Sequence, residues 1–337
     1  MSKRIHVLIS GEPFGPYPEA EFCQHVADKK ILKTDLAWRE GLSDWLPAAE
    51  MLITLAADQG TTAAWTPTPK SVFEETLGAA ERGDVEAQFK LGQLCAKAEG
   101  TALNHVEAAK WFRQAAERGH ARAQFQLSLQ LATGQGVVAD EAESLQWLGK
   151  AAEAGHAEAQ YTLGFKHANA QGAPADDEAA MRWFQKAAAQ DHAVAQCSLG
   201  FMHDKGRGTP QSNGEALVWY RKAAERGDAV AQNNLALMIA QGQGVPKNDA
   251  EAAPWFRRAA EQGVAGAQTN YGLLLAKGQG VPQDYAEAYK WFNLAAAQGH
   301  ANGTKNRELL AAEMTKEQIA EGQKRAAQFV AKRQAGS

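Results

Sequence analysis

Residues 267–296 read AQTNYGLLLAKGQGVPQDYAEAYKWFNLAA, and this pattern occurs six times in the chain at a fixed interval of 36 residues. No unit carries an insertion or a deletion, so six tryptophans share one register: Trp111, Trp147, Trp183, Trp219, Trp255 and Trp291. Self-similarity at a period of about 20 to 50 residues is typical of stacked supersecondary units, none of which can bury its apolar face alone. The sequence therefore predicts a repeat array.

Each unit of this array is predicted to be two helices joined by a glycine turn. In the first unit, Ala87 and Leu91 recur at helical spacing, which indicates a helix over about residues 85–97. The second helix carries Trp111 and Phe112 on one apolar stripe, and we expect the tryptophan of every unit to lie in the core. Glycine permits the positive φ that the intervening turn requires. The turn glycines are Gly100, Gly136, Gly172, Gly208, Gly244 and Gly280.

The second helix of each unit begins at a predicted N-cap residue, and these residues are Asn104, Asp140, Asp176, Ser212, Asn248 and Asp284. Glutamate follows three residues later in five of the six units, a spacing that predicts a reciprocal capping box. Two positions depart from the repeat. Asp191 stands where the other units have glycine, which predicts a strained turn, and Pro254 falls inside a second helix, which predicts a kink or a short helix.

The array is predicted to span residues 71–312 as an all-α, right-handed α/α solenoid with six full units and a partial seventh. Residues 301–312 predict the first helix of that seventh unit. Thr315 and Gln318 predict a capping box before a final helix over about 316–333. We expect residues 313–337 to form a C-terminal capping helix.

The first 56 residues are predicted to be a separate, small α+β domain. Strands are expected over residues 5–10 and 34–38, with a helix over 19–29 between them. Because a domain of this size has a small core, Trp38 and Trp45 are expected to fill it. Residues 57–70 are rich in Gly, Thr and Pro and predict an extended linker. Trp65 in this linker either packs on the first helix of the solenoid or docks on the small domain or on a partner.

Composition argues against several classes of protein. The chain has 35 basic and 39 acidic side chains, so no basic footprint for nucleic acid is evident. No run approaches about 18 consecutive apolar residues, so no membrane-spanning helix is expected. The three cysteines are too few and too scattered to predict a disulfide framework or a zinc site, and a cytoplasmic location is the simplest interpretation.

Catalytic motifs are not evident either, and we expect no enzymatic activity, no cofactor and no metal. Neither a phosphate-binding Gly-Lys-Ser or Gly-Lys-Thr loop nor a His-Glu-x-x-His pair occurs. One repeat position holds His120, His156, His192 and His300. Packed helices lie about 8–10 Å apart, whereas zinc ligands lie about 2 Å from one ion. We therefore interpret these histidines as exposed residues at helix starts.

The first helices of stacked helical pairs line the concave side of a solenoid, so their outward positions are the predicted partner contacts. The predicted contacts are Lys90, Lys97, Arg122, Gln126, Thr162, Asn169, Ser198, Lys205, Asn234, Gln241, Asn270 and Lys277, with Val194 and Val230 in the same register. Asn234 and Asn270 each offer a donor and an acceptor for a peptide backbone. A protein or peptide ligand is therefore expected.

The repeated unit, with Ala-x-Ala-Gln, Gly-x-Gly-Val-Pro and Trp-Phe-x-x-Ala-Ala, resembles the Sel-one-like repeat, a relative of the tetratricopeptide repeat, over about residues 71–310. This resemblance implies a non-enzymatic scaffold or adaptor that holds protein partners on its concave face. An alternative is a small-molecule binder or a hydrolase of cell-wall or β-lactam type, because a few cysteine-rich relatives are associated with that chemistry. Those relatives have a cysteine pair in each repeat, which this chain lacks.

The first domain resembles the bacterial GYF-like domain through residues 11–17, residues 36–41 and Trp45. The resemblance implies a second binding module, in which Tyr17, Trp38 and Trp45 would contact a partner. Bacterial domains of this kind commonly begin with a Trp-Tyr pair, and here Ile5 and His6 occupy that place.

Overall fold

The structure is a computed structural model that describes residues 4–9, 12–28, 30–32, 35–39, 45–48, 50–51, 55, 72–99, 102–171 and 175–335. The chain divides into two compact units, Met1–Glu75 and Thr76–Ser337. The predicted linker 57–70 with Trp65, and the turn glycines Gly100 and Gly172, lie outside the described residues.

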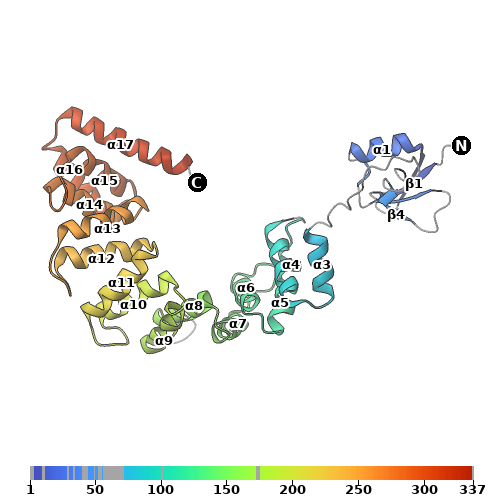
Figure 1. The fold of residues 1–337 in the computed structure, drawn as a ribbon, viewed down its shortest axis with the longest axis horizontal. Coiled ribbons are helices and arrows are strands. Elements are labelled where there is room, and N and C mark those ends of the chain that lie inside the picture. Colours follow the sequence, from blue (N-terminus) through green and yellow to red (C-terminus); the bar gives the residue numbers. More distant parts are fainter. Residues whose placement is uncertain are drawn as a thin grey trace. The chain divides into compact units, whose positions relative to one another are not determined.

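The first unit contains an antiparallel sheet in the order β2-β1-β3-β4 and, among the residues that the structure describes, the helix α1 (Glu19–Ala27) (Figure 1). Its strands are β1 (Ile5–Ile9), β2 (Glu12–Tyr17), β3 (Leu36–Arg39) and β4 (Leu46–Pro47). The helix and the strands β1 and β3 match the elements expected from the sequence to within a few residues.

The core of this unit differs from the expectation. It consists of Ile5, Val7, Phe22, Val26, Ile31, Ala37, Ala48, Met51 and Leu55. Successive side chains of a strand point to opposite faces, so Ala37 takes the inner face of β3 and Trp38 the outer one. Trp38 is half-buried and Trp45 is 38% exposed, with their ring centroids 6.5 Å apart. The prediction that these two rings fill the core is wrong.

The second unit is a solenoid of helical hairpins that stack in sequence order (Figure 1). Its helices are α3 (Val72–Glu81), α4 (Val85–Lys97), α5 (His105–Glu117), α6 (Ala121–Thr133), α7 (Glu141–Glu153), α8 (Ala157–Ala168), α9 (Asp177–Ala188), α10 (Ala193–Lys205), α11 (Asn213–Glu225), α12 (Ala229–Gln241), α13 (Asp249–Glu261), α14 (Ala265–Lys277), α15 (Tyr285–Ala297), α16 (Ala301–Ala311) and α17 (Lys316–Ala335). The expected helix over 85–97 is α4, and the two C-terminal helices also lie where the sequence places them.

The recurring core residue is the one after each tryptophan. Phe112, Leu148, Phe184, Tyr220, Phe256 and Phe292 are each 1 or 2% exposed. Of the register tryptophans only Trp147 and Trp291 are buried, and the other four are half-buried. A cation covers the open ring face at several of them; Lys186 Nζ, for example, lies 4.0 Å from the Trp183 centroid. The expectation that all six tryptophans are core residues is therefore wrong for four of them.

The predicted N-caps of the second helices are confirmed, but their capping boxes are only half formed. The Asp140 side chain accepts a hydrogen bond from the Glu143 N–H at 2.9 Å. The Asp140 N–H, however, donates to the Leu131 carbonyl at 3.0 Å, so the Glu143 carboxylate is free to pair with Arg113 of the preceding unit at 2.6 Å. A reciprocal box does form at Thr315, which exchanges two hydrogen bonds with Gln318.

Pro254 neither ends nor shortens its helix. Helix α13 continues for 13 residues from Asp249 to Glu261 with Pro254 inside it. Pro254 and Ala250 are both exposed, so the carbonyl that loses its N–H partner can bond to water. The prediction of a short helix is wrong. Asp191 does adopt a left-handed conformation, with φ +62°, as the departure from glycine predicts.

Candidate functional site

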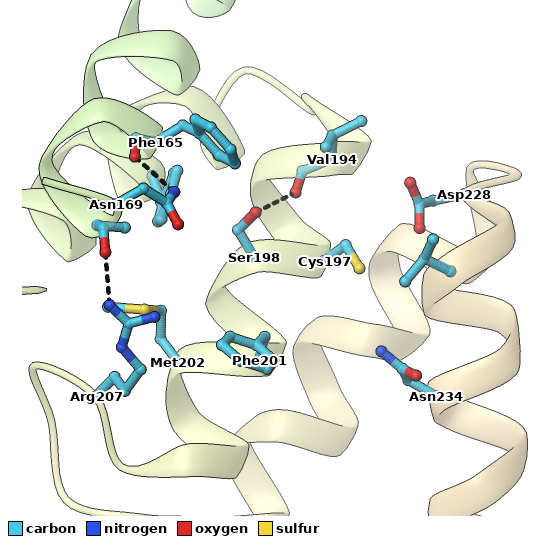
Figure 2. A pocket seen from close by; sticks show the side chains of 13 residues that line it. Phe165, Asn169, Val194, Cys197, Ser198, Phe201, Met202, Arg207, Asp228 and Asn234 are labelled. Carbon is cyan, nitrogen blue, oxygen red and sulfur yellow. Dashed lines mark hydrogen bonds between the residues drawn. The ribbon is translucent and has the colours of Figure 1, made fainter. Parts of the chain in front are cut away.

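A cavity of about 300 Å³ opens among the first helices of three successive units, α8, α10 and α12. Figure 2 shows that its wall brings together Asn169 from the end of α8, Ser198 from α10 and Asn234 from α12. All three are predicted contacts, and they come from positions 29 and 36 residues apart in the chain. The repeat register thus places separate polar side chains around one hollow.

Exposed apolar side chains make up much of the same wall. Phe165, Phe201, Val194 and Val230 are 41 to 54% exposed. The two phenylalanines share one repeat position, six residues after the alanine of the Ala-Gln cassette, which was not among the predicted contacts. The sequence signal for this position is that three successive units have a large apolar residue there: Leu129, Phe165 and Phe201. Leu129 is also 41% exposed.

The polar side chains of the wall are held by local bonds. Asn169 Nδ2 donates to the Phe165 carbonyl at 2.8 Å, and Ser198 Oγ donates to the Val194 carbonyl at 2.9 Å. The Arg207 guanidinium donates to the Ala168 carbonyl at 2.7 Å and pairs with Asp177. These bonds fix the orientation of the wall, as a preformed binding site requires.

Nothing in the cavity resembles an activated nucleophile. Cys197 is 8% exposed, and burial together with the Asp228 carboxylate, to which it is hydrogen-bonded, raises the pKa of its thiol. The Asp228 side chain accepts from the Ala231 N–H at 2.7 Å as the N-cap of α12. A thiol is a nucleophile only when deprotonated, so the raised pKa makes Cys197 a poor nucleophile.

The other predicted contacts lie on first helices without lining the cavity. Lys97, Lys205, Gln241 and Lys277 are exposed at the last residues of α4, α10, α12 and α14. Lys90 and Arg122 are also exposed, whereas Gln126, Thr162 and Asn270 are half-buried. Arg122 is paired with Glu86 at 2.7 Å. Their role in binding stays a prediction.

The four register histidines are N-caps, a role that the sequence did not indicate. Nδ1 of His120, His156, His192 and His300 accepts the backbone N–H three residues later at 3.1 to 3.3 Å. Three of the rings pack against an aromatic ring of the preceding unit: His120 and His192 stack on Phe89 and Tyr161, and His156 lies tilted against Phe125 at 4.8 Å. They are half-buried, so the prediction of exposed side chains is wrong, although they do stand at helix starts. Burial lowers the pKa of His156.

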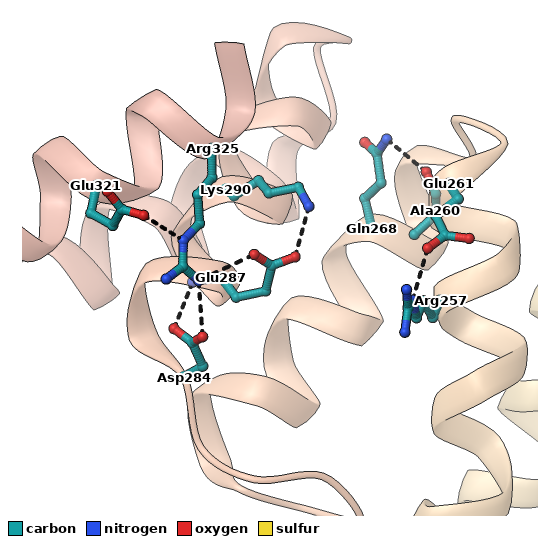
Figure 3. Close-up of polar contacts among 9 residues, drawn as sticks. All are labelled: Arg257, Ala260, Glu261, Gln268, Asp284, Glu287, Lys290, Glu321 and Arg325. Carbon is teal, nitrogen blue, oxygen red and sulfur yellow. Dashed lines mark hydrogen bonds and ion pairs between the residues drawn. The ribbon is translucent and has the colours of Figure 1, made fainter. Parts of the chain in front are cut away.

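An ion-pair cluster fastens the last helix to the array (Figure 3). Arg325 of α17 bonds to Glu321 and Asp284, both at 2.9 Å, and to Glu287 at 3.3 Å. The hydrogen bonds that Arg325 donates to the first two carboxylates raise the pKa of its guanidinium. These charges are satisfied by one another, so this cluster stabilises α17 against α15 rather than offering a ligand site.

Comparison with known proteins assigns both units. Sel1 repeats match residues 85–120, 121–156, 157–192, 193–228, 229–264 and 265–300, and GYF domain 2 matches residues 6–51. The chain belongs to the Sel1 repeat family. Proteins of this family are generally non-enzymatic helical scaffolds for protein interactions. No curated protein matched the sequence.

Two solved structures share the solenoid. A Sel1 repeat protein from Oxalobacter formigenes is 33% identical, with a TM-score of 0.61, and the match covers 83% of this chain and 87% of that one. The protein c5321 of uropathogenic Escherichia coli, described as a protective antigen displaying an SLR fold, is 28% identical with a TM-score of 0.53, over 84% of this chain and 71% of that one.

Two further findings apply to the part of the chain that the structure describes. None of its helices combines the length and the apolar character needed to cross a bilayer. No three of its histidine, cysteine, aspartate or glutamate residues are grouped so that they could hold a metal ion.

Proposed function

We propose that this chain is a non-enzymatic scaffold that holds a segment of a partner protein in the cavity of α8, α10 and α12, which we call the groove. The observation that carries the proposal is the joint placement of exposed Phe165 and Phe201 with Asn169, Ser198 and Asn234 around one hollow. Apolar side chains that stay in water are candidates for burial by a partner.

The size of the groove favours a peptide segment. Ligand pockets occupy about 300–1,000 Å³, and the groove, at about 300 Å³, lies at the lower end of that range. It has room for one or two side chains of a partner. The surrounding Asn and Ser side chains offer hydrogen bonds to the backbone that carries them.

The GYF-like unit is proposed as a second contact point. Trp38 of β3 has Trp45 at 6.5 Å and the His6 ring at 5.9 Å, measured between ring centroids. Tyr17 is half-buried, packs against the core and lies edge-on to His25 at 5.2 Å, so the two tryptophans carry this part of the proposal. Two contacts joined by a linker raise the effective concentration of the second without new chemistry.

A cytoplasmic location accords with the thiols. Cys23, Cys95 and Cys197 are all free, as is usual in a reducing compartment. The alternative of a hydrolase has no specific observation in its favour, because burial raises the pKa of the Cys197 thiol and Arg207 is paired with Asp177.

Affinity purification with the full-length chain, read by mass spectrometry, tests the proposal. The double variant Phe165→Gln/Phe201→Gln uses the residue that the first unit has at this position, Gln93, so the helices should form. Leu129→Gln is the matched control, in the same register but outside the groove. We expect the double variant to lose a partner that the control retains. A partner list that is the same for both variants would contradict the proposal, and Trp45→Ala tests the second module independently.

A further inference from the structure

We propose that the groove selects segments in which a large apolar side chain lies close in sequence to a lysine or an arginine. This inference rests on the proposed function and adds the chemistry of the partner. It follows from two properties of the groove wall: its open aromatic surface and its one unpaired charge.

The apolar requirement comes from the centre of the wall. Figure 2 shows Phe201 of α10 with Cys197 to one side of it and Met202, next to Arg207, to the other; Phe165 of α8 lies above them in the view. Phe165 and Phe201 are more than 40% exposed, whereas Cys197 and Met202 behind them are nearly buried. A large apolar side chain of a partner that packs on these rings removes their exposed surface from water, which contributes about 25 cal/mol per Å².

The preference for a basic residue follows from the charged side chains of the same wall. Its charged residues are Arg207 and Asp228. Arg207 forms two bonds with Asp177, at 2.5 and 3.1 Å, so its charge is neutralised. Asp228 forms no ion pair within the described ranges, and the nearby Arg226 is paired with Asp191. The wall therefore carries a net negative charge at Asp228.

The N-terminus of α12 reduces this charge without removing it. Asp228 caps α12, and a helix N-terminus carries about half a unit of positive charge. The carboxylate supplies a full negative charge. The Cys197 thiol adds a hydrogen bond to it but no charge. A cation arriving at the groove is thus attracted, and an acidic segment is repelled.

The positions of the two features set the order of contacts. In Figure 2, Asp228 stands at the end of the groove near Val194 and Cys197, and Phe201 lies further along α10. An apolar side chain between the phenylalanines brings its neighbouring residues toward Val194 and Asp228. A bound segment that covers the exposed Val194 and Val230 excludes water from this end of the groove, and the lower local dielectric then strengthens the attraction.

A displayed library of random peptides, selected against the full-length chain, tests the inference. Asp228→Asn removes the charge and keeps an N-cap, because asparagine caps as well as aspartate. Asp140→Asn is the matched control: the same change at the N-cap of α7, outside the groove. We expect the original chain and the control to enrich peptides that pair an aromatic or a large aliphatic residue with lysine or arginine. Asp228→Asn should keep the apolar preference and lose the basic one.

Fluorescence anisotropy with the most enriched peptide gives the magnitude. We expect Asp228→Asn to weaken its binding about three- to tenfold at low salt, with the difference shrinking as salt screens the charge. Enrichment of apolar residues with no charge preference, or with an acidic one, overturns this inference and leaves the proposed function standing. If no peptide is enriched, or if the enriched peptides bind the Phe165→Gln/Phe201→Gln variant equally well, the proposed function fails as well.

Discussion

Replacing Gly280 by alanine should break the junction between the fifth and sixth units, and replacing Gly278 should not. Both glycines have left-handed backbones, with φ +69° and +64°. A Cβ on Gly280 would lie 2.5 Å from the Ala250 nitrogen and equally close to the Asp249 carbonyl oxygen, at the start of α13. A Cβ on Gly278 would meet Gln283 Cβ at 3.4 Å, an ordinary contact.

Both substitutions therefore strain a left-handed backbone, and only Gly280→Ala also creates a steric overlap. A left-handed alanine costs about 1–2 kcal/mol at either position. Overlap with a backbone that must move adds about 1–3 kcal/mol at Gly280 alone. We expect Gly278→Ala to lower the free energy of unfolding by about 1–2 kcal/mol and Gly280→Ala by about 2–5 kcal/mol.

Urea denaturation followed by circular dichroism measures the difference between the two variants. Repeat arrays can unfold in parts, so hydrogen exchange across α13 and α14 should accompany it, with faster exchange confined to that junction in Gly280→Ala. If the two variants agree to within about 0.5 kcal/mol, close approach between units is not what requires Gly280, and the reasoning is refuted.

Three further predictions concern the core and the acid range. Phe256→Ala should lower the free energy of unfolding by about 3–5 kcal/mol, since Phe256 is 2% exposed. Trp255→Ala should lower it less, because Trp255 is half-buried. A lower urea midpoint for Trp255→Ala than for Phe256→Ala would contradict this prediction. Burial lowers the pKa of His156 from 6.5, so the unfolded chain binds the proton more readily and stability should fall as the pH drops below 6.5; His156→Asp keeps a cap acceptor and should remove this loss in thermal unfolding. The hydrogen bond from Arg113 lowers the pKa of Glu143 from 4.5. The ionised carboxylate therefore stabilises the fold above pH 4.5, and this stabilisation is lost as the pH falls through the lower pKa of the folded chain. Glu143→Gln should weaken the dependence of stability on pH in this acid range, as measured by an acid titration.

Local rules predicted the helices of the array and their starts. The extent of α4 follows from apolar spacing, and the N-caps of the second helices follow from side chains that bond three residues ahead. These interactions lie within a few residues of one another, so one unit contains all the information. The partner of Glu143 does not follow in this way, because Arg113 lies 30 residues away in the preceding unit.

The choice between adjacent apolar residues could not be predicted from one helix. Trp183 and Phe184 share the same stripe, and either could face the core. The partner helix of the same unit decides for Phe184, which fits against Gly164 of α8, where a Cβ would lie 2.9 Å from the ring. Trp183 instead packs at the edge of the core of the preceding unit. A helical wheel shows which residues lie on the apolar stripe, but it does not show the shape of the helix surface that packs against them.

The same reasoning explains which part of the groove was predicted. Asn169, Ser198 and Asn234 were expected because polar residues at outward positions are read as exposed. Phe165 and Phe201 were missed, since an apolar residue on an amphipathic helix is assigned to the core by default. Their exposure depends on how far adjacent first helices stand apart, which only the packed units determine.

One departure from the repeat is coupled to another across units. At the repeat position of Arg226, Gln190 and Gln262 donate to glycine carbonyls 35 residues earlier, Gly155 at 2.9 Å and Gly227 at 3.1 Å. At the end of the third unit that glycine is Asp191, and Arg226 of the fourth unit pairs with its carboxylate. The strained backbone of Asp191 is thus offset by an ion pair that glycine could not form, and the glutamine contact is replaced rather than lost. Within one unit, Asp191 in place of glycine only strains the backbone. Across two units, it replaces the hydrogen bond between glutamine and glycine with an ion pair to Arg226.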